Sequence, residues 1–141
     1  MENHSFDNIA GYWDYRNDID NLVGMEYCNN YTNPYYTIYN QSLEICASPY
    51  EQEVPLNDPD HDFLGTNWEI YQNYHPSNDD VRTMGGFVER ESTRYNSTPG
   101  DSAFVIKAFS QKHTNILATI GQNYAVFDSY VSFWQFTITT F

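Results

Sequence analysis

NYAVFDSYVSFWQFTITTF, residues 123–141, is the strongest strand signal in the chain. Its β-branched residues would crowd the turns of a helix, and neither end carries a capping residue. From Phe133 to Phe141 the stretch has no charge, so we expect a central or interface strand there rather than an exposed edge. The stretch therefore predicts a protein built around a β-sheet.

Most of the remaining chain has strand character too. Segments rich in Tyr, Ile and Thr are separated by Asn, Pro and Gly. The predicted strands are Met25–Tyr31, Tyr35–Tyr39, Ser42–Ala47, Asn67–Tyr74, Arg82–Tyr95 with a bulge at Gly85-Gly86, Ala103–Phe109 and Asn115–Ile120. Only Phe6–Tyr15, behind a Ser5 cap, and Asp18–Met25 have the character of short helices.

These elements predict an all-β protein with one or two short N-terminal helices. We expect a single domain, residues 1–141, folded as an antiparallel barrel or sandwich of about eight strands. The length of 141 residues suits one ordinary domain. An aromatic content of 18% argues against a disordered chain, because disordered chains are poor in aromatic residues.

Charge is distributed unevenly along the chain. Residues 1–80 hold fifteen acidic residues against one base, Arg16, which is a net charge of −14. Residues 81–141 hold four acids against five bases, which is a net charge of +1. Such a field repels nucleic acid and anionic membranes and attracts basic surfaces. We therefore expect no direct nucleic-acid or membrane partner.

The leading functional prediction is a non-enzymatic binding protein. Its acidic half, rich in Tyr and Asn, would contact a basic protein surface, for example as an inhibitor that mimics the charge of nucleic acid. A homo-oligomeric neighbour is a second candidate partner. The predicted contact residues are Tyr12, Trp13, Asp14, Tyr35, Tyr36, Glu51, Glu53 and Trp68. Against this stands the reading that many tyrosines simply fill a core poor in aliphatic residues.

Three other classes remain open. They are a small-ligand or glycan-binding barrel or sandwich, a self-assembling structural protein, and a small barrel-type isomerase using Asp, His and Tyr. An enzyme is the less favoured reading, and we assign no catalytic residue. The sequence contains no nucleophile elbow, Walker loop, dinucleotide fingerprint or Cys–His pairing signature.

Acidic residues recur at metal-ligand spacing in one loop. Asp58, Asp60 and Asp62 occupy positions one, three and five of a twelve-residue stretch that ends at Glu69. This spacing resembles a calcium-binding EF-hand loop, but Phe63 stands where that loop needs Gly and no flanking helices are expected. The sequence favours a solvated acidic loop, with a Ca²⁺ site at these four residues as the alternative. No other cofactor is expected.

Three arginines form a second candidate site. With a single bulge at Gly85-Gly86, strand alternation would place Arg82, Arg90 and Arg94 on one face. Such a trio would bind a carboxylate or phosphate. The favoured reading is that they neutralise the chain's own acidic half.

The remaining signals concern processing. Cys28 and Cys46 are the only cysteines; two semi-buried thiols are favoured over a bridge between neighbouring strands. Four Asn-X-Ser/Thr sequons begin at Asn3, Asn30, Asn40 and Asn96, where about two would arise by chance. The N-terminus lacks a signal-peptide pattern. We therefore expect either an intracellular protein or a mature secreted or virion form whose leader was removed.

Overall fold

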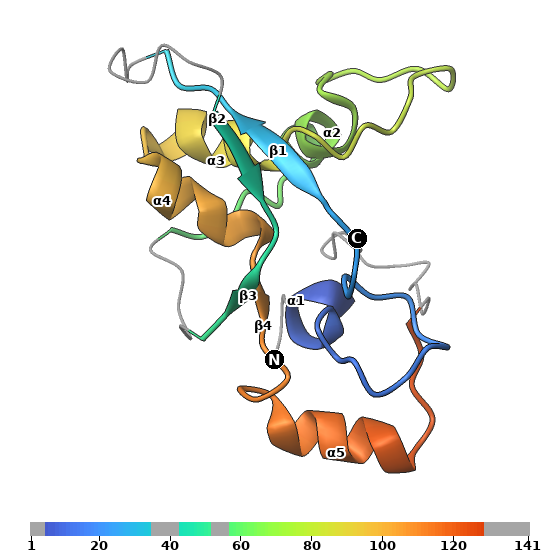
Figure 1. The fold of residues 1–141 in the computed structure, drawn as a ribbon. Coiled ribbons are helices and arrows are strands. Elements are labelled where there is room, and N and C mark those ends of the chain that lie inside the picture. Colours follow the sequence, from blue (N-terminus) through green and yellow to red (C-terminus); the bar gives the residue numbers. More distant parts are fainter. Residues whose placement is uncertain (1–4, 35–42, 52–56, 129–141) are drawn as a thin grey trace. The chain divides into compact units, whose positions relative to one another are not determined.

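The computed structural model describes residues 5–34, 43–51 and 57–128 (Figure 1). The chain divides into two compact units, each built from separated parts of the sequence. Unit 1 comprises Met1–Glu26, Ser48–Glu53 and Lys107–Phe141, and unit 2 comprises Tyr27–Ala47 and Val54–Ile106. The expectation of one domain over residues 1–141 stays a prediction. Within the described ranges, no helix has the length and apolar character needed to span a membrane.

Unit 1 contains two helices, α1 (Phe6–Ala10) and α5 (Asn115–Asn123), and a short parallel pair, β3 (Pro49–Tyr50) with β4 (Ala108–Phe109). The Ser5 cap of α1 is confirmed, because its hydroxyl accepts a hydrogen bond from the N–H of Asn8 at 3.1 Å. The second predicted helix, Asp18–Met25, is not helical. The buried core residues of the unit are Ala10, Trp13, Ile19 and Ala118.

Unit 2 combines a two-stranded sheet with helices. Strands β1 (Cys28–Tyr31) and β2 (Leu43–Cys46) are antiparallel, with Cys28 opposite Cys46. The helices are α2 (Phe63–Tyr71), α3 (Phe87–Tyr95), α4 (Pro99–Ser102) and the 3-10 helix η2 (Ala103–Ile106). The buried apolar core consists of Tyr31, Phe87, Val88 and Ile106. The two cysteines form a disulfide between the strands, so the favoured expectation of two thiols is wrong and the bridge is present.

Strand β1 fixes the start of α3. The N-cap residue of this helix is Gly86, which has no side chain to offer. The buried Asn29 of β1 replaces it: its side-chain oxygen accepts hydrogen bonds from the N–H groups of Phe87 at 3.0 Å and Val88 at 3.4 Å. The Asn29 amide nitrogen donates to the carbonyl oxygen of Met84 at 3.1 Å. One side chain thus ties the sheet to the segment that begins α3.

The prediction of an all-β barrel or sandwich is wrong. The protein is mixed α/β; its described part contains two sheets of two strands each and no closed barrel. Three predicted strands, Asn67–Tyr74, Arg82–Tyr95 and Asn115–Ile120, are largely or wholly helical. The predicted strand Ala103–Phe109 is mostly η2, with only β4 extended. Met25–Tyr31 and Ser42–Ala47 do contain β1 and β2.

The composition of the buried helix faces explains why helices were predicted as strands. Helix α2 buries Gly65 and Glu69, one without a side chain and the other a carboxylic acid. A helix with such a face lacks the apolar stripe by which helices are recognised, and the alternation around Trp68 and Ile70 then imitates a strand. Tyr35–Tyr39 and residues 129–141 of the C-terminal stretch lie outside the described residues. Residues 124–128 are neither helix nor strand.

Candidate functional site

Five charged residues of unit 2 meet beside helices α2 and α3. We call them the acid–arginine cluster, and they are Asp60, Glu69, Arg90, Glu91 and Arg94. Asp60 precedes α2, Glu69 lies on α2, and the other three lie on α3. The three acids are 2–4% exposed. Carboxylates are rarely buried this deeply without partners.

Asp60 is the centre of the cluster. Its carboxylate accepts from Nε and Nη2 of Arg90, each at 2.6 Å, and forms a second ion pair with Nη1 of Arg94. The N–H of Asp62 donates to the same carboxylate at 3.2 Å. Burial alone would raise the pKa of Asp60, but these hydrogen bonds and the two guanidinium charges hold the pKa below its ordinary value.

Local structure brings these groups together. Arg90 and Arg94 are four residues apart on α3 and therefore lie on the same helix face. Asp62 caps α2 by accepting the N–H of Gly65 at 2.7 Å. Gly65 leaves room for Asp60, because a Cβ at this position would lie 2.3 Å from the Asp60 carboxylate. The loop and both helices therefore position one buried acid against two bases.

Burial raises the pKa of both glutamates of the cluster. Burial, reinforced by the charge of Asp60, raises the pKa of Glu69 to about 8, although both arginines oppose the shift. Burial also raises the pKa of Glu91. Its Oε1 accepts a hydrogen bond from Asn57 at 3.0 Å, and its buried Oε2 has no hydrogen-bond partner within the described residues.

Polar and aromatic groups line the exposed side of the cluster. Arg90 donates to the hydroxyl of Tyr74 at 3.3 Å, and the Tyr74 ring packs on Trp68 with centroids 4.7 Å apart. The Arg94 side chain is 35% exposed. The Nδ1 atom of His61 lies 3.0 Å from the carbonyl oxygen of Pro59. The cluster thus combines buried carboxyl groups with a partly exposed guanidinium group.

The predicted contact residues fall in different places. Tyr12, Trp13, Asp14 and Glu51 belong to unit 1, and Trp68 belongs to unit 2. Trp13 is buried and donates from its indole N–H to the hydroxyl of Thr114 at 2.9 Å, so it serves the core of unit 1. Tyr35, Tyr36 and Glu53 lie outside the described residues.

Only two of the three predicted anion-binding arginines lie together in the structure. Arg90 and Arg94 lie together through helical spacing, not through the predicted strand alternation. Arg82 is not part of the cluster: its Nε lies 3.3 Å from the hydroxyl of Tyr71. The sequence-based interpretation missed Glu91 and its partner Asn57, since neither belongs to a recognisable motif. The one available signal was the spacing of the two arginines, which suits either a strand or a helix.

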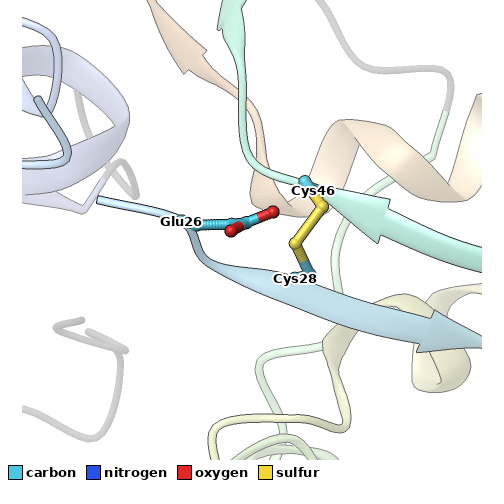
Figure 2. A group of neighbouring side chains, drawn as sticks. All are labelled: Glu26, Cys28 and Cys46. Atoms are coloured by element: carbon cyan, nitrogen blue, oxygen red, sulfur yellow. A yellow bond between two sulfur atoms is a disulfide. The ribbon is translucent and has the colours of Figure 1, made fainter. Parts of the chain in front are cut away.

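The arrangement of the predicted calcium ligands does not suit a cation. Asp60 faces two guanidinium groups, Asp62 caps α2, and buried Glu69 favours its neutral form. The other three-ligand grouping in the described residues is Glu26 with Cys28 and Cys46. Figure 2 shows that both sulfurs are joined in the disulfide, and a disulfide sulfur is not the thiolate that metals bind.

Comparison with known proteins gives one result. No curated protein matches the chain. A family model described as the Phosphoesterase family matches residues 1–139. This match indicates a hydrolytic enzyme. The prediction of a non-enzymatic binding protein that acts as a charge-mimicking inhibitor is therefore wrong. The alternatives that require an all-β barrel are contradicted by the mixed α/β fold. Because the match spans nearly the whole sequence, the chain belongs to the phosphoesterase family.

Proposed function

We propose that this protein hydrolyses phosphoesters and that the acid–arginine cluster binds the phosphoryl group of the substrate. The observation that carries the proposal is the family match over residues 1–139. The cluster supports it, because guanidinium groups bind phosphate through planar, paired N–H donors. The described part of the chain brings two arginines to one carboxylate only at this cluster.

Arg94 is the better placed of the two arginines to bind substrate. Its side chain is 35% exposed, whereas that of Arg90 is 21% exposed. Nη1 of Arg94 is paired with Asp60, and a guanidinium carries five N–H donors. The remaining donors would stabilise the charge that builds up on phosphoryl oxygens during hydrolysis.

Asp60 is a positioning residue in this proposal. It is buried and holds the two guanidinium groups side by side before substrate arrives. Donors that are already oriented cost no reorganisation when the reaction occurs. The raised pKa of Glu69 leaves it neutral at pH 7, so it does not compete with the substrate anion for the arginines.

His61 is the group we assign to proton transfer. Its Nδ1 contacts the carbonyl oxygen of Pro59 at 3.0 Å and lies 3.9 Å from the Asp58 carboxylate. A carbonyl partner favours the tautomer that is protonated at Nδ1 and leaves Nε2 free to accept a proton. The imidazole is half exposed, so water can reach it directly.

Enzymes of this family are often metal-dependent. The described residues do not fit a metal centre, because the cluster carboxylate already faces two cations and the sulfurs of the other grouping form a disulfide. We therefore place no Ca²⁺ ion at Asp58, Asp60, Asp62 and Glu69.

The test is hydrolysis of two chromogenic substrates, p-nitrophenyl phosphate and bis(p-nitrophenyl) phosphate. Both substrates are assayed with and without added divalent cations, so that activity is detected whether or not the enzyme needs a metal ion. We expect Arg94→Gln to lower kcat/KM by roughly 100-fold, the usual effect of removing one transition-state donor. Arg94→Lys should recover part of the loss, because it restores the charge without the planar donors.

The matched control is Arg82→Gln, since Arg82 is an exposed arginine outside the cluster. We expect it to retain the activity of the unchanged protein. Failure of the protein to hydrolyse either substrate under any cation condition would overturn the proposed activity. Full activity in Arg94→Gln would be consistent with phosphoester hydrolysis by this protein. It would show, however, that Arg94 of the acid–arginine cluster does not bind the phosphoryl group.

A further inference from the structure

Two sequons of unit 2 lie beside each other in space. They are Asn30-Tyr-Thr32 at the end of β1 and Asn96-Ser-Thr98 directly after α3. Both asparagines are exposed, whereas the central residues of both sequons, Tyr31 and Ser97, are 2% and 6% exposed. The hydroxyl of Tyr31 donates to the carbonyl oxygen of Ser97 at 2.8 Å. Each sequon is therefore held by its buried centre while its asparagine faces solvent.

Asn96 has the geometry of an accessible acceptor. It ends α3 in the left-handed region, with φ 51° and ψ 41°, a conformation that Asn tolerates better than most residues. Its side-chain oxygen accepts a hydrogen bond from Asn33 at 3.3 Å. Its amide nitrogen Nδ2 has no partner within the described residues. The atom that carries an N-linked sugar is thus the one the fold leaves to solvent.

A second observation concerns the compartment in which the chain folds. The Cys28–Cys46 disulfide joins β1 to β2, and Cys28 lies two residues before Asn30. Disulfides form and persist in oxidising compartments such as the endoplasmic reticulum and the cell exterior. The secretory route of eukaryotic cells is also where Asn-X-Ser/Thr sequons are glycosylated. The disulfide and the exposed sequons therefore point to the same route.

We propose that Asn30 and Asn96 are N-glycosylation sites on one surface of unit 2. The co-substrate is a lipid-diphosphate-linked oligosaccharide. A bond forms between Asn Nδ2 and C1 of the first sugar, the C1–O bond to the diphosphate breaks, and the proton released from Nδ2 passes to solvent. The lipid diphosphate leaves, and nothing is oxidised or reduced. The Asn96 side-chain oxygen is unchanged by this step, so its hydrogen bond from Asn33 survives.

The experiment is secretion of the full chain from a eukaryotic host, followed by site-resolved mass spectrometry. Peptide-N-glycosidase converts each glycosylated Asn to Asp, which marks the site that carried the sugar. We expect glycans at Asn30 and Asn96. Asn96→Gly, which keeps the left-handed turn, should lose one glycan, and Asn30→Gln should lose the other. The control Asn78→Gln changes an exposed Asn outside any sequon and should lose none.

A secreted protein that is unmodified at both asparagines overturns the proposal, and modification at one overturns the assignment of the other. Free thiols at Cys28 and Cys46 in the secreted protein would overturn it as well, because the chain would then not be oxidised in the compartment where sequons are glycosylated. These readouts are masses and do not involve activity. The proposal therefore stands or falls independently of phosphoester hydrolysis.

Discussion

Arg90 contacts the buried carboxylate of Asp60 through two nitrogens, Nε and Nη2, each 2.6 Å from Oδ2. The two residues are thirty positions apart in the sequence. The pair joins the loop before α2 to helix α3, and Arg94 adds a second guanidinium to the same carboxylate. This contact organises the acid–arginine cluster and has direct consequences for stability.

Replacing Asp60 should destabilise unit 2 strongly. Asp60→Asn leaves two partly buried guanidinium groups without their counter-charge, and breaking a buried ion pair from one side typically costs about 3–5 kcal/mol. Urea denaturation measures the loss. Asp58→Asn is the matched control, because the Asp58 side chain is 77% exposed, and it should change the free energy of unfolding by less than about 0.5 kcal/mol. Equal effects of the two variants would contradict the assignment.

Glu69 should make the protein less stable as pH rises. Its pKa is raised from 4.5 to about 8 in the folded state, so the folded protein holds a proton that the unfolded chain releases. The resulting stability is fully present below pH ~4.5 and is lost as pH rises towards 8. Glu69→Gln keeps a neutral side chain at every pH. We expect it to raise stability at pH 8 by a few kcal/mol, since one pKa unit corresponds to about 1.4 kcal/mol.

The measurement is thermal unfolding of both proteins from pH 5 to pH 9. The curves should converge at the acidic end and separate as pH rises. A parallel offset at all pH values would show that Glu69 acts through packing rather than through its proton.

Asn29 should prove important for the start of α3. Asn29→Ala removes the acceptor for two helix N–H groups and the donor to the carbonyl of Met84. Leaving buried polar groups unsatisfied costs about 1–3 kcal/mol. Hydrogen exchange should show faster exchange at the amides of Phe87 and Val88 in this variant. Unchanged exchange at these two amides would refute the capping role, and Asn78→Ala serves as the exposed control.

The disulfide should stabilise unit 2. The bridge closes a loop with a sequence separation of 18 residues, for which the chain-entropy model gives about 3 kcal/mol. Replacing both cysteines by alanine should lower the free energy of unfolding by roughly that amount, as measured in urea. Reductant should destabilise the unchanged protein similarly and leave the double variant unaffected. A reductant effect on the double variant would point to another cause.

Several elements follow from local sequence. The Ser5 hydroxyl and the spacing of Phe6, Ile9 and Ala10 predict α1, and the β-rich segments around Cys28 and Cys46 predict β1 and β2. In each case neighbouring residues carry the information, through a cap or through strand propensity. Sequence also marked Asp60, Arg90 and Arg94 as candidate site residues, although it assigned them to two different sites.

Tertiary structure decided the rest. Helix α2 buries Gly65 and Glu69, and α3 buries Glu91 and Ser92 beside its apolar residues, so neither face has the apolar pattern that identifies a helix from sequence. In the folded chain Asp60 lies against Gly65 of α2 and pairs with both arginines of α3. By itself the sequence determined the charges and the short local elements. Asp60 contacts Arg90 and Arg94, which are thirty or more residues away in the sequence, only once the chain is folded.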